Sequence, residues 1–439
     1  MKRTYRVCAA LVVGVLALAG CGSAQSGSGG AESDASGTTL KWWAWNAAEA
    51  ETTIAEFEKQ NPGITVEFTT YSNDDYLNNL RAALTSDKGP DVLQLAPGGT
   101  VTAYGDLVQD LAPLAATAWG EDWRSGFNEL GLTQLQKGDK QVALPSYMSA
   151  AGFLYYNSGI LGEVGAEAPT DLDQMASVCE KVRAAGYDCL AHGAKDAWVN
   201  LDVYLALMNS IEPGLVYRAI DGTEKWTGPR FVEGMDAWRS LFTGGIIAPG
   251  AAAVSEYPDA STAFLEGKAA FIALGTWNTP ATMTKTGLET AQKSVSTTID
   301  STFLSAAFPA ARAGGTPTRA FGGPDNGWAI SSKSRQQEAA WKFVSFLAGE
   351  EGQTIQASVG NFPALTSVPV STDDVIVPEQ AADIQRQEEE LAGMVGYRQI
   401  PYPDLEAALG QALGEVAAGT STPQDALAQV ETVSSTLSR

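Results

Sequence analysis

The chain has 439 residues, with 28 Lys and Arg against 51 Asp and Glu, and a formal net charge of −23 at pH 7. This negative charge disfavours binding to nucleic acid and to anionic lipid surfaces. Hydrophobic residues make up 44% of the sequence, which is typical of a globular protein, and the length favours two folded lobes.

The first segment of the chain has the pattern of a secretion signal. Residues 2–6 carry three basic side chains, and residues 7–18 form an apolar run that is too short to span a membrane comfortably. The run ends in LAGC, whose last residue is Cys21. This pattern resembles the lipobox of bacterial lipoproteins, which predicts a signal peptide over 1–20 and lipidation, including palmitate, at Cys21. The alternative is an ordinary secretion signal with an incidental cysteine.

Residues 21–37 are rich in Gly and Ser and contain no large apolar side chain. Such a segment cannot contribute to a core, so we expect a flexible tether between a membrane anchor and a globular body. Without the signal, 25 basic residues face 51 acidic ones, and the charge of the mature chain becomes −26. No later segment is apolar enough to predict a membrane span.

Two further cysteines, Cys179 and Cys189, are separated by nine residues. In an exported protein this spacing predicts a disulfide, and two buried free thiols are the alternative. A zinc site is not expected, because His192 is the only histidine and the spacing fits no usual zinc motif.

The first predicted elements alternate between strand and helix. Hydrophobic patterns and breaker residues indicate strands at 40–45, 64–68 and 91–95, with helices at 47–60 and 76–84. This order predicts an α/β fold with parallel strands.

Three later helices have recognisable starts. Thr170, Ser334 and Thr422 each stand three residues before Asp or Gln, so each hydroxyl could accept a hydrogen bond from the first helical turn. Pro423 occupies the first helical position after Thr422.

Six stretches, in this order, resemble the extracellular solute-binding proteins of ABC importers, specifically the carbohydrate-binding group that includes maltose-binding protein. They are FEKQNPGITVEF (57–68), LRAALTSDKGPDVLQL (80–95), FLYYNSGIL (153–161), AFLEGKAAFIALGTW (263–277), NGWAISSKSRQQEAAWKFVSFLAGEEGQ (326–353) and VGNFPA (359–364). The resemblance implies two α/β lobes of the type II periplasmic-binding-protein-like fold, joined by a hinge, with the ligand cleft between them. The implied crossings between lobes lie near 143–150 and 321–326. The implied lobes are 38–146 plus about 325–365, and 147–324 plus about 366–439.

The sequence KWWAWN places three tryptophans at the end of the first predicted strand. Alternation puts Trp43 and Trp45 on one side and Trp42 on the other. We expect Trp42 to pack in the core, and Trp43 or Trp45, with Asn46, to face the cleft beyond the strand ends. Packing of all three tryptophans in the core is the alternative.

A sugar ring presents an apolar C–H face and a rim of hydroxyl groups, so its site needs aromatic rings beside amides and carboxylates. The resemblance places Pro97 and Gly98 in a cleft loop, Trp198 in a ligand-contacting segment, and Trp277 where an aromatic ring commonly stacks on sugar. The other candidate ligand-binding residues combine aromatic and polar side chains: Tyr71, Asp74, Tyr147, Asn278, Asp325 and Asn326.

The implied function is that of a lipid-anchored binding protein on the extracellular face of the cell membrane. As a monomer, it would bind a mono- or oligosaccharide and deliver it to permease subunits in the membrane. No cofactor and no nucleic-acid partner are expected. Tyr155 and Tyr156 could suggest an iron site, because paired tyrosines bind ferric ion in some relatives. Side chains of adjacent strand residues point to opposite faces, however, so both cannot easily reach one ion. Another polar solute, such as a polyamine, remains an alternative. A carbohydrate-active enzyme is less favoured, because no nucleophile motif stands out and a pair of acids among 51 carries no information.

Overall fold

The computed structural model describes residues 37–439 except 46 and 48, and the side chain of Asp74 is also not described. The predicted signal, Cys21 and most of the predicted tether therefore lie outside the described residues, as does Asn46. Residues Gly37–Arg439 form one unit, and no helix in this described part is long and apolar enough to cross a membrane.

The first sheet has the strand order β2-β1-β3-β13-β6. Its strands are β1 (Thr38–Ala44), β2 (Ile64–Thr70), β3 (Val92–Leu95), β6 (Leu144–Pro145) and β13 (Gly327–Ile330). Strand β1 pairs in parallel with β2 and β3, whereas β13 is antiparallel to β3 and β6. The predicted alternation is confirmed, with α1 at Ala50–Gln60 and α2 at Asn73–Leu84 between these strands.

Alternation along β1 buries one of its faces completely. Trp42 has no exposed surface and its ring centroid lies 4.6 Å from Phe68, 5.3 Å from Trp328 and 5.1 Å from Phe343. Phe343 belongs to α14 (Gln337–Ala348), which packs on this face of the sheet. The prediction that Trp42 belongs to the core is confirmed, and its burial fixes which face of β1 is left for Trp43 and Trp45.

The second sheet has the order β11-β8-β10-β9, built from β8 (Phe153–Asn157), β9 (Asp188–Ala191), β10 (Ala269–Leu274) and β11 (Phe303–Ala307). All six residues of β10 are buried, as expected for a central strand. The surrounding helices include α7 (Leu172–Ala184), α8 (Ala197–Ile211), α10 (Pro229–Thr243), α16 (Pro378–Ala392), α17 (Pro403–Ala417) and α18 (Pro423–Ser434).

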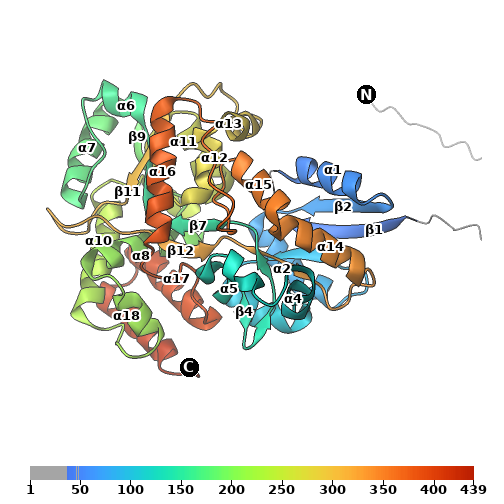
Figure 1. Ribbon diagram of the computed structural model, residues 1–439. Helices are drawn as coiled ribbons and strands as arrows, with labels where there is room; N and C mark the ends of the chain where they lie inside the picture. Colours follow the sequence, from blue (N-terminus) through green and yellow to red (C-terminus); the bar gives the residue numbers. More distant parts are fainter. Residues whose placement is uncertain (1–36, 46, 48) are drawn as a thin grey trace, which may run out of the picture. The chain divides into compact units, whose positions relative to one another are not determined.

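A two-stranded pairing connects the two parts of the fold. Strand β7 (Met148–Ala151) is antiparallel to β12 (Phe321–Pro324), and these strands fall where the sequence predicts the chain to cross between lobes. Figure 1 shows β7 and β12 between the elements of the two sheets. The residue boundaries of the lobes remain a proposal.

The remaining α-helices and β-strands are short. They are α3 (Gly99–Tyr104), α4 (Ala112–Trp119), α5 (Glu129–Thr133), α6 (Ser158–Glu163), α9 (Leu215–Ile220), α11 (Ser261–Leu265), α12 (Thr279–Met283), α13 (Lys285–Gln292), α15 (Glu350–Ser358), β4 (Gln136–Lys137) and β5 (Lys140–Gln141).

One of the three predicted helix starts is correct. Thr422 accepts a hydrogen bond from the backbone N–H of Asp425 at 3.2 Å and caps α18. The prediction for Thr170 is wrong by one residue, because the carboxylate of Asp171 accepts the capping bond instead. The prediction for Ser334 is also wrong, since α14 begins at Gln337 and the Ser334 hydroxyl bonds Asp91.

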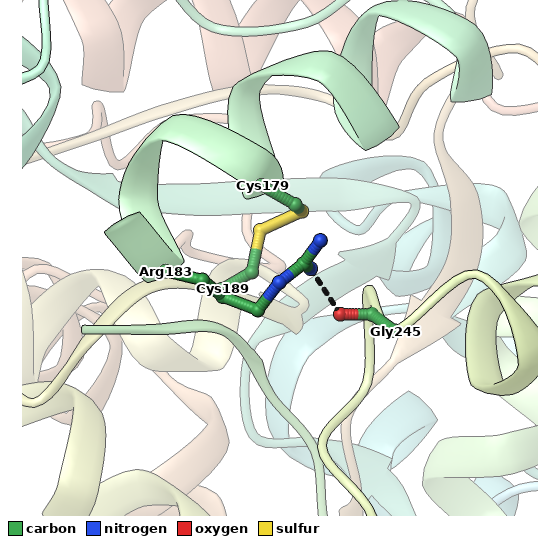
Figure 2. Close-up of a disulfide and its surroundings, with 4 residues drawn as sticks. All are labelled: Cys179, Arg183, Cys189 and Gly245. Carbon is green, nitrogen blue, oxygen red and sulfur yellow. Dashed lines mark hydrogen bonds between the residues drawn. A yellow bond between two sulfur atoms is a disulfide. The ribbon is translucent and has the colours of Figure 1, made fainter. Parts of the chain in front are cut away.

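The predicted disulfide is confirmed. Cys179 on α7 bonds Cys189 on β9, with 5.1 Å between the Cα atoms. Beside it, the guanidinium of Arg183 donates a hydrogen bond to the carbonyl of Gly245 (Figure 2). The bridge therefore joins a helix directly to the edge strand of the second sheet.

Candidate functional site

Three aromatic rings from distant segments meet beside the second sheet. Trp198 lies parallel to Tyr257, with ring centroids 6.0 Å apart and planes at 9°. Trp277 meets Trp198 edge-on at 6.3 Å and 65°. The indole N–H of Trp277 also donates a hydrogen bond to the Tyr257 hydroxyl at 3.2 Å. We call these three residues the aromatic corner.

The aromatic corner is open to a ligand. Tyr257 is 48% exposed, whereas Trp198 and Trp277 are half-buried. Burial of its surroundings nevertheless raises the pKa of the Tyr257 hydroxyl, and the neighbouring Glu256 adds to that shift. An exposed aromatic ring whose hydroxyl is held by a neighbouring indole N–H is available to stack on a ligand.

The position of Trp277 depends on the glycine before it. Trp277 follows β10 by way of Gly275, so it stands just beyond a strand end, where ligands bind in α/β sheets. A Cβ atom on Gly275 would lie 2.0 Å from the Trp277 ring and 2.4 Å from the carbonyl oxygen of Ala150. Only glycine therefore lets the indole ring fold back over the backbone in this way.

Arg398 and Asp202 form an ion pair against the aromatic corner. The Nε atom of Arg398 donates to both carboxylate oxygens of Asp202, at 2.9 and 3.0 Å, and the two side chains are 15% and 7% exposed. The Arg398 guanidinium also lies 4.0 Å from the centroid of Trp277 and 5.5 Å from that of Trp198. Arg398 therefore occupies one face of Trp277 by a cation–π contact.

Two opposing effects act on this pair. Burial acts most strongly on Arg398 and would lower its pKa, but the charge and hydrogen bonds of Asp202, together with Asp325 and Tyr257, outweigh it and the pKa is raised. For Asp202, burial is the largest effect and raises the pKa, although the charge and hydrogen bonds of Arg398 oppose that shift. Because Nε contacts both carboxylate oxygens, the geometry favours the charged pair at neutral pH.

A cluster of polar side chains lies at the β7–β12 pairing. Asp325 accepts hydrogen bonds from the Ser149 hydroxyl at 3.1 Å and from the Asn326 amide at 3.0 Å, and its backbone N–H donates to the carbonyl of Tyr147. Burial raises the pKa of the Tyr147 hydroxyl well above its usual range, and Asp325 adds to that shift. The structure thus brings three of the predicted site residues, Tyr147, Asp325 and Asn326, together.

The tryptophans at the end of β1 lie elsewhere. The ring of Trp43 packs on Tyr71 and that of Trp45 on Tyr76, each with 5.0 Å between centroids. Both tryptophans remain partly exposed, on the face of β1 opposite Trp42. The predicted alternation is confirmed, but the structure does not bring these residues or Tyr71 into contact with the aromatic corner. Asp74 lies in α2.

The loop after β3 contacts the segment that carries Arg398. Gly98 has a φ of +71°, and a Cβ atom there would lie 2.8 Å from the Cβ of Gln399. The Thr102 hydroxyl donates a hydrogen bond to the carbonyl of Pro401 at 3.1 Å. Gly98, which the sequence predicts to contact ligand, is therefore packed against protein here, and the neighbouring Pro97 is buried.

Asn278 lies next to Trp277 and is 5% exposed. Its side-chain N–H₂ group has no hydrogen-bond partner among the described residues. A buried amide without a partner is uncommon, so a ligand hydroxyl group could complete its hydrogen bonding.

A cavity of about 450 Å³ lies away from the aromatic corner. It is lined by Glu49, Thr52, Thr286, Ile355, Ser358, Val359, Ser371, Asp373 and Asp374. This lining supplies hydroxyl groups and carboxylates but no aromatic ring to cover an apolar ligand face. We therefore assign the candidate site to the aromatic corner, where ring faces and hydrogen-bonding groups occur together.

Three residues of the candidate site, Asp202, Tyr257 and Arg398, are missing from the sequence predictions. One signal is visible in retrospect: Asp202 interrupts an apolar stretch of α8, AWVNLDVYLALM, and a buried acid requires a partner. Nothing in the sequence around Tyr257 or Arg398 indicates their positions.

Solved structures of several binding proteins resemble this one. A chitin oligosaccharide binding protein is 22% identical with a TM-score of 0.74, covering 91% of this chain and 98% of its own. Maltose-bound T. maritima MalE3 is 18% identical with a TM-score of 0.72, covering 91% and 99%. The GacH receptor of Streptomyces glaucescens, solved unliganded and with acarbose, is 17% identical with a TM-score of 0.69, covering 90% and 97%. These similarities establish the two-lobed, maltose-binding-protein-like fold.

Sequence comparison agrees with the fold. A curated protein of Brucella abortus (strain 2308), described as a binding protein, is 24% identical over 293 residues, which make up 66% of this chain and 66% of the relative. The sequence profile for bacterial extracellular solute-binding proteins matches residues 42–354. On that match, the chain belongs to the bacterial extracellular solute-binding protein family.

Proposed function

We propose that this protein captures a mono- or oligosaccharide between its two lobes and delivers it to a membrane permease. The observation that carries the proposal is the aromatic corner, where three rings from separate segments remain accessible beside buried polar groups. Aromatic faces can cover the C–H face of a sugar ring, and neighbouring amides and carboxylates can bind its hydroxyl groups.

The predicted site residues divide into three groups under this proposal. Trp198, Trp277 and Asn278 would contact the sugar directly, together with the newly found Tyr257. Tyr147, Asp325 and Asn326 would bind hydroxyl groups at the β7–β12 pairing. The proposed site also includes Trp43, Trp45, Tyr71, Asp74, Pro97 and Gly98, from the other proposed lobe. Asn46, which lies outside the described residues, is also proposed to contact the ligand.

Capture would proceed by closure of the lobes. Contacts from both lobes to one ligand exist only in the closed form, so the ligand shifts the population towards that form. No covalent chemistry is required, which agrees with membership in a family of binding proteins. In the proposed setting Cys21 carries the lipid anchor, the tether follows it, and the body stands on the extracellular face of the membrane.

Similar structures support a saccharide as the ligand, since they include a chitin oligosaccharide binding protein, a maltose-bound protein and a receptor in complex with acarbose. A thermal-shift screen of the full chain with neutral saccharides tests the proposal. Stabilisation should grow with the logarithm of the saccharide concentration above its dissociation constant. Chromatography of the same mixtures should show unaltered saccharides, and shortened products would indicate an enzyme instead.

A second candidate ligand class is a cationic solute such as a polyamine. The acids near the aromatic corner favour this alternative, because Asp202, Asp325 and Glu406 all interact with Arg398 or with one another. Spermidine and putrescine therefore belong in the same screen. Stabilisation by these amines alone would reject a saccharide as the ligand.

A further inference from the structure

We infer that the Arg398–Asp202 pair makes the site selective against anionic saccharides such as uronates and sugar phosphates. The inference rests on the proposed function and narrows its substrate class to uncharged or cationic sugars. It depends on one cation, Arg398, whose charge is already matched by a buried partner within the protein.

The geometry keeps Arg398 in place before any ligand arrives. Both carboxylate oxygens of Asp202 accept from Nε, and the guanidinium packs over the ring of Trp277 at 4.0 Å. No hydrogen-bond partner for Nη1 or Nη2 of Arg398 is found in the described part of the chain. The guanidinium can therefore donate to ligand hydroxyl groups while its charge remains balanced by Asp202.

Among the described residues, the other ionisable groups that interact with this pair are acids and the Tyr257 hydroxyl. Asp325 and Glu406 both interact electrostatically with Arg398. Glu256, next to Tyr257 in the chain, interacts with Asp202 and is fully buried. Because burial raises the pKa of Glu256 to about 8, Glu256 holds its proton at neutral pH and adds no charge. An anionic ligand at the aromatic corner would thus meet one neutralised cation and the carboxylate of Asp325.

An uncharged sugar avoids this repulsion. Rejection of a competitor by unfavourable charges is a general route to specificity, since it needs no additional contact to the correct ligand. Because Asp202 balances its charge, the Arg398 guanidinium can stay over the Trp277 ring and still attract dissolved anions only weakly.

The test uses matched neutral and anionic saccharides. Neutral hexose disaccharides and trisaccharides that bind the full chain are compared by calorimetry with the uronates that carry a carboxylate at C6 in place of the hydroxymethyl group. We expect each uronate to bind at least about tenfold more weakly, as one unfavourable charge in a partly buried site requires. Equal or tighter binding of the uronates would overturn the inference.

Asp202→Asn tests the role of the pair itself. It removes the balancing charge but keeps an acceptor for Arg398, so the preference for neutral over anionic saccharide should fall by about tenfold. The double variant Asp202→Asn with Arg398→Gln replaces the ion pair by a neutral pair, and it should regain most of the preference. Asp236→Asn, an exposed change on α10 with the same change in net charge, should leave the preference unaltered. An unchanged preference in folded Asp202→Asn would contradict the role assigned to Asp202.

A second measurement does not require a bound saccharide. Quenching of tryptophan fluorescence by anionic iodide is compared with quenching by neutral acrylamide. The ratio of iodide to acrylamide quenching should rise in Asp202→Asn and stay constant in Asp236→Asn. If no neutral or anionic saccharide binds, the proposed function fails. An unchanged ratio of iodide to acrylamide quenching in Asp202→Asn would contradict the charge inference, whether or not a saccharide binds.

Discussion

The guanidinium of Arg398 lies over the ring of Trp277, 4.0 Å from its centroid. One face of this indole is therefore covered by the protein, while Tyr257 remains 48% exposed beside it. The rings left for a ligand are Tyr257, Trp198 and the remaining surface of Trp277.

Replacing Trp277 by alanine should weaken saccharide binding by about 1–3 kcal/mol, because a stacking surface and the hydrogen bond to Tyr257 are lost. Calorimetric titration gives the affinity, and circular dichroism should show a retained fold. Trp341→Ala on α14 is the matched control, since Trp341 packs against Trp119 and should affect stability without changing affinity. An unaltered affinity in Trp277→Ala would place the site elsewhere.

Gly98→Ala should impair lobe closure. The added Cβ atom would lie 2.8 Å from Gln399 and 3.0 Å from the carbonyl oxygen of Ile400. The α3 loop and the segment before α17 would then be unable to approach as closely, and saccharide affinity should fall several-fold. Solution scattering should show less compaction with saccharide.

Gly138→Ala provides a control for backbone strain. Gly138 also has a positive φ, +58°, but a Cβ atom there would meet nothing within 4 Å. Gly138→Ala should lose about 1 kcal/mol of stability from its positive φ, and Gly98→Ala should lose more, because its ψ of −124° also lies outside the left-handed helical region. Only Gly98→Ala should lose affinity, and equal affinities would show that the contact with Gln399 has no part in binding.

Glu256 should make the protein less stable as the pH rises. Burial raises its pKa from 4.5 to about 8, so the folded state holds a proton that the unfolded state releases. Its stabilising contribution is therefore complete below about pH 4.5 and is lost as the pH rises towards 8, at up to about 1.4 kcal/mol per pH unit.

Glu256→Gln removes this ionisation. Gln can still accept the hydrogen bond that the backbone N–H of Gly193 donates to Glu256 at 2.7 Å. Thermal unfolding should show the variant more stable than the wild type at pH 8, with the advantage shrinking towards pH 5. The exposed Glu338→Gln change should show no such trend, and a pH-independent difference for Glu256→Gln would contradict the assigned ionisation.

Loss of the disulfide should lower stability by about 2–3 kcal/mol, since the bridge closes a short loop in the unfolded chain. The double variant Cys179→Ala with Cys189→Ala should unfold a few degrees lower than the oxidised wild type. Reduced wild type is the control and should match the double variant. Saccharide affinity should stay unchanged, because neither cysteine lies at the aromatic corner.

The parts of the fold that depend on local pattern could be predicted from sequence. The alternation of β1 places Trp42 in the core because the side-chain period of a strand is fixed, and the order of strands and helices gives the parallel arrangement of β1, β2 and β3. Helix starts are less certain when two capping residues are adjacent, as with Thr170 and Asp171. There the structure selects the residue whose oxygen reaches the N–H of Gln174.

The candidate site could be predicted only in part, because it is assembled from distant segments. Trp198 and Trp277 carry recognisable surroundings, and the structure places them together. Arg398 and Asp202 are 196 positions apart, and only the packing of the segment before α17 against α8 brings them into contact. Tyr257 has no periodic pattern that would indicate its exposure beside these rings.

The most direct test of saccharide capture at the aromatic corner is calorimetric titration of the full chain and of the Trp198→Ala, Trp277→Ala double variant with neutral mono- and oligosaccharides. We expect saturable one-to-one binding of at least one saccharide to the wild type and loss of that binding in the folded double variant. Undiminished binding in the double variant, or no heat with any saccharide, would contradict the proposed function.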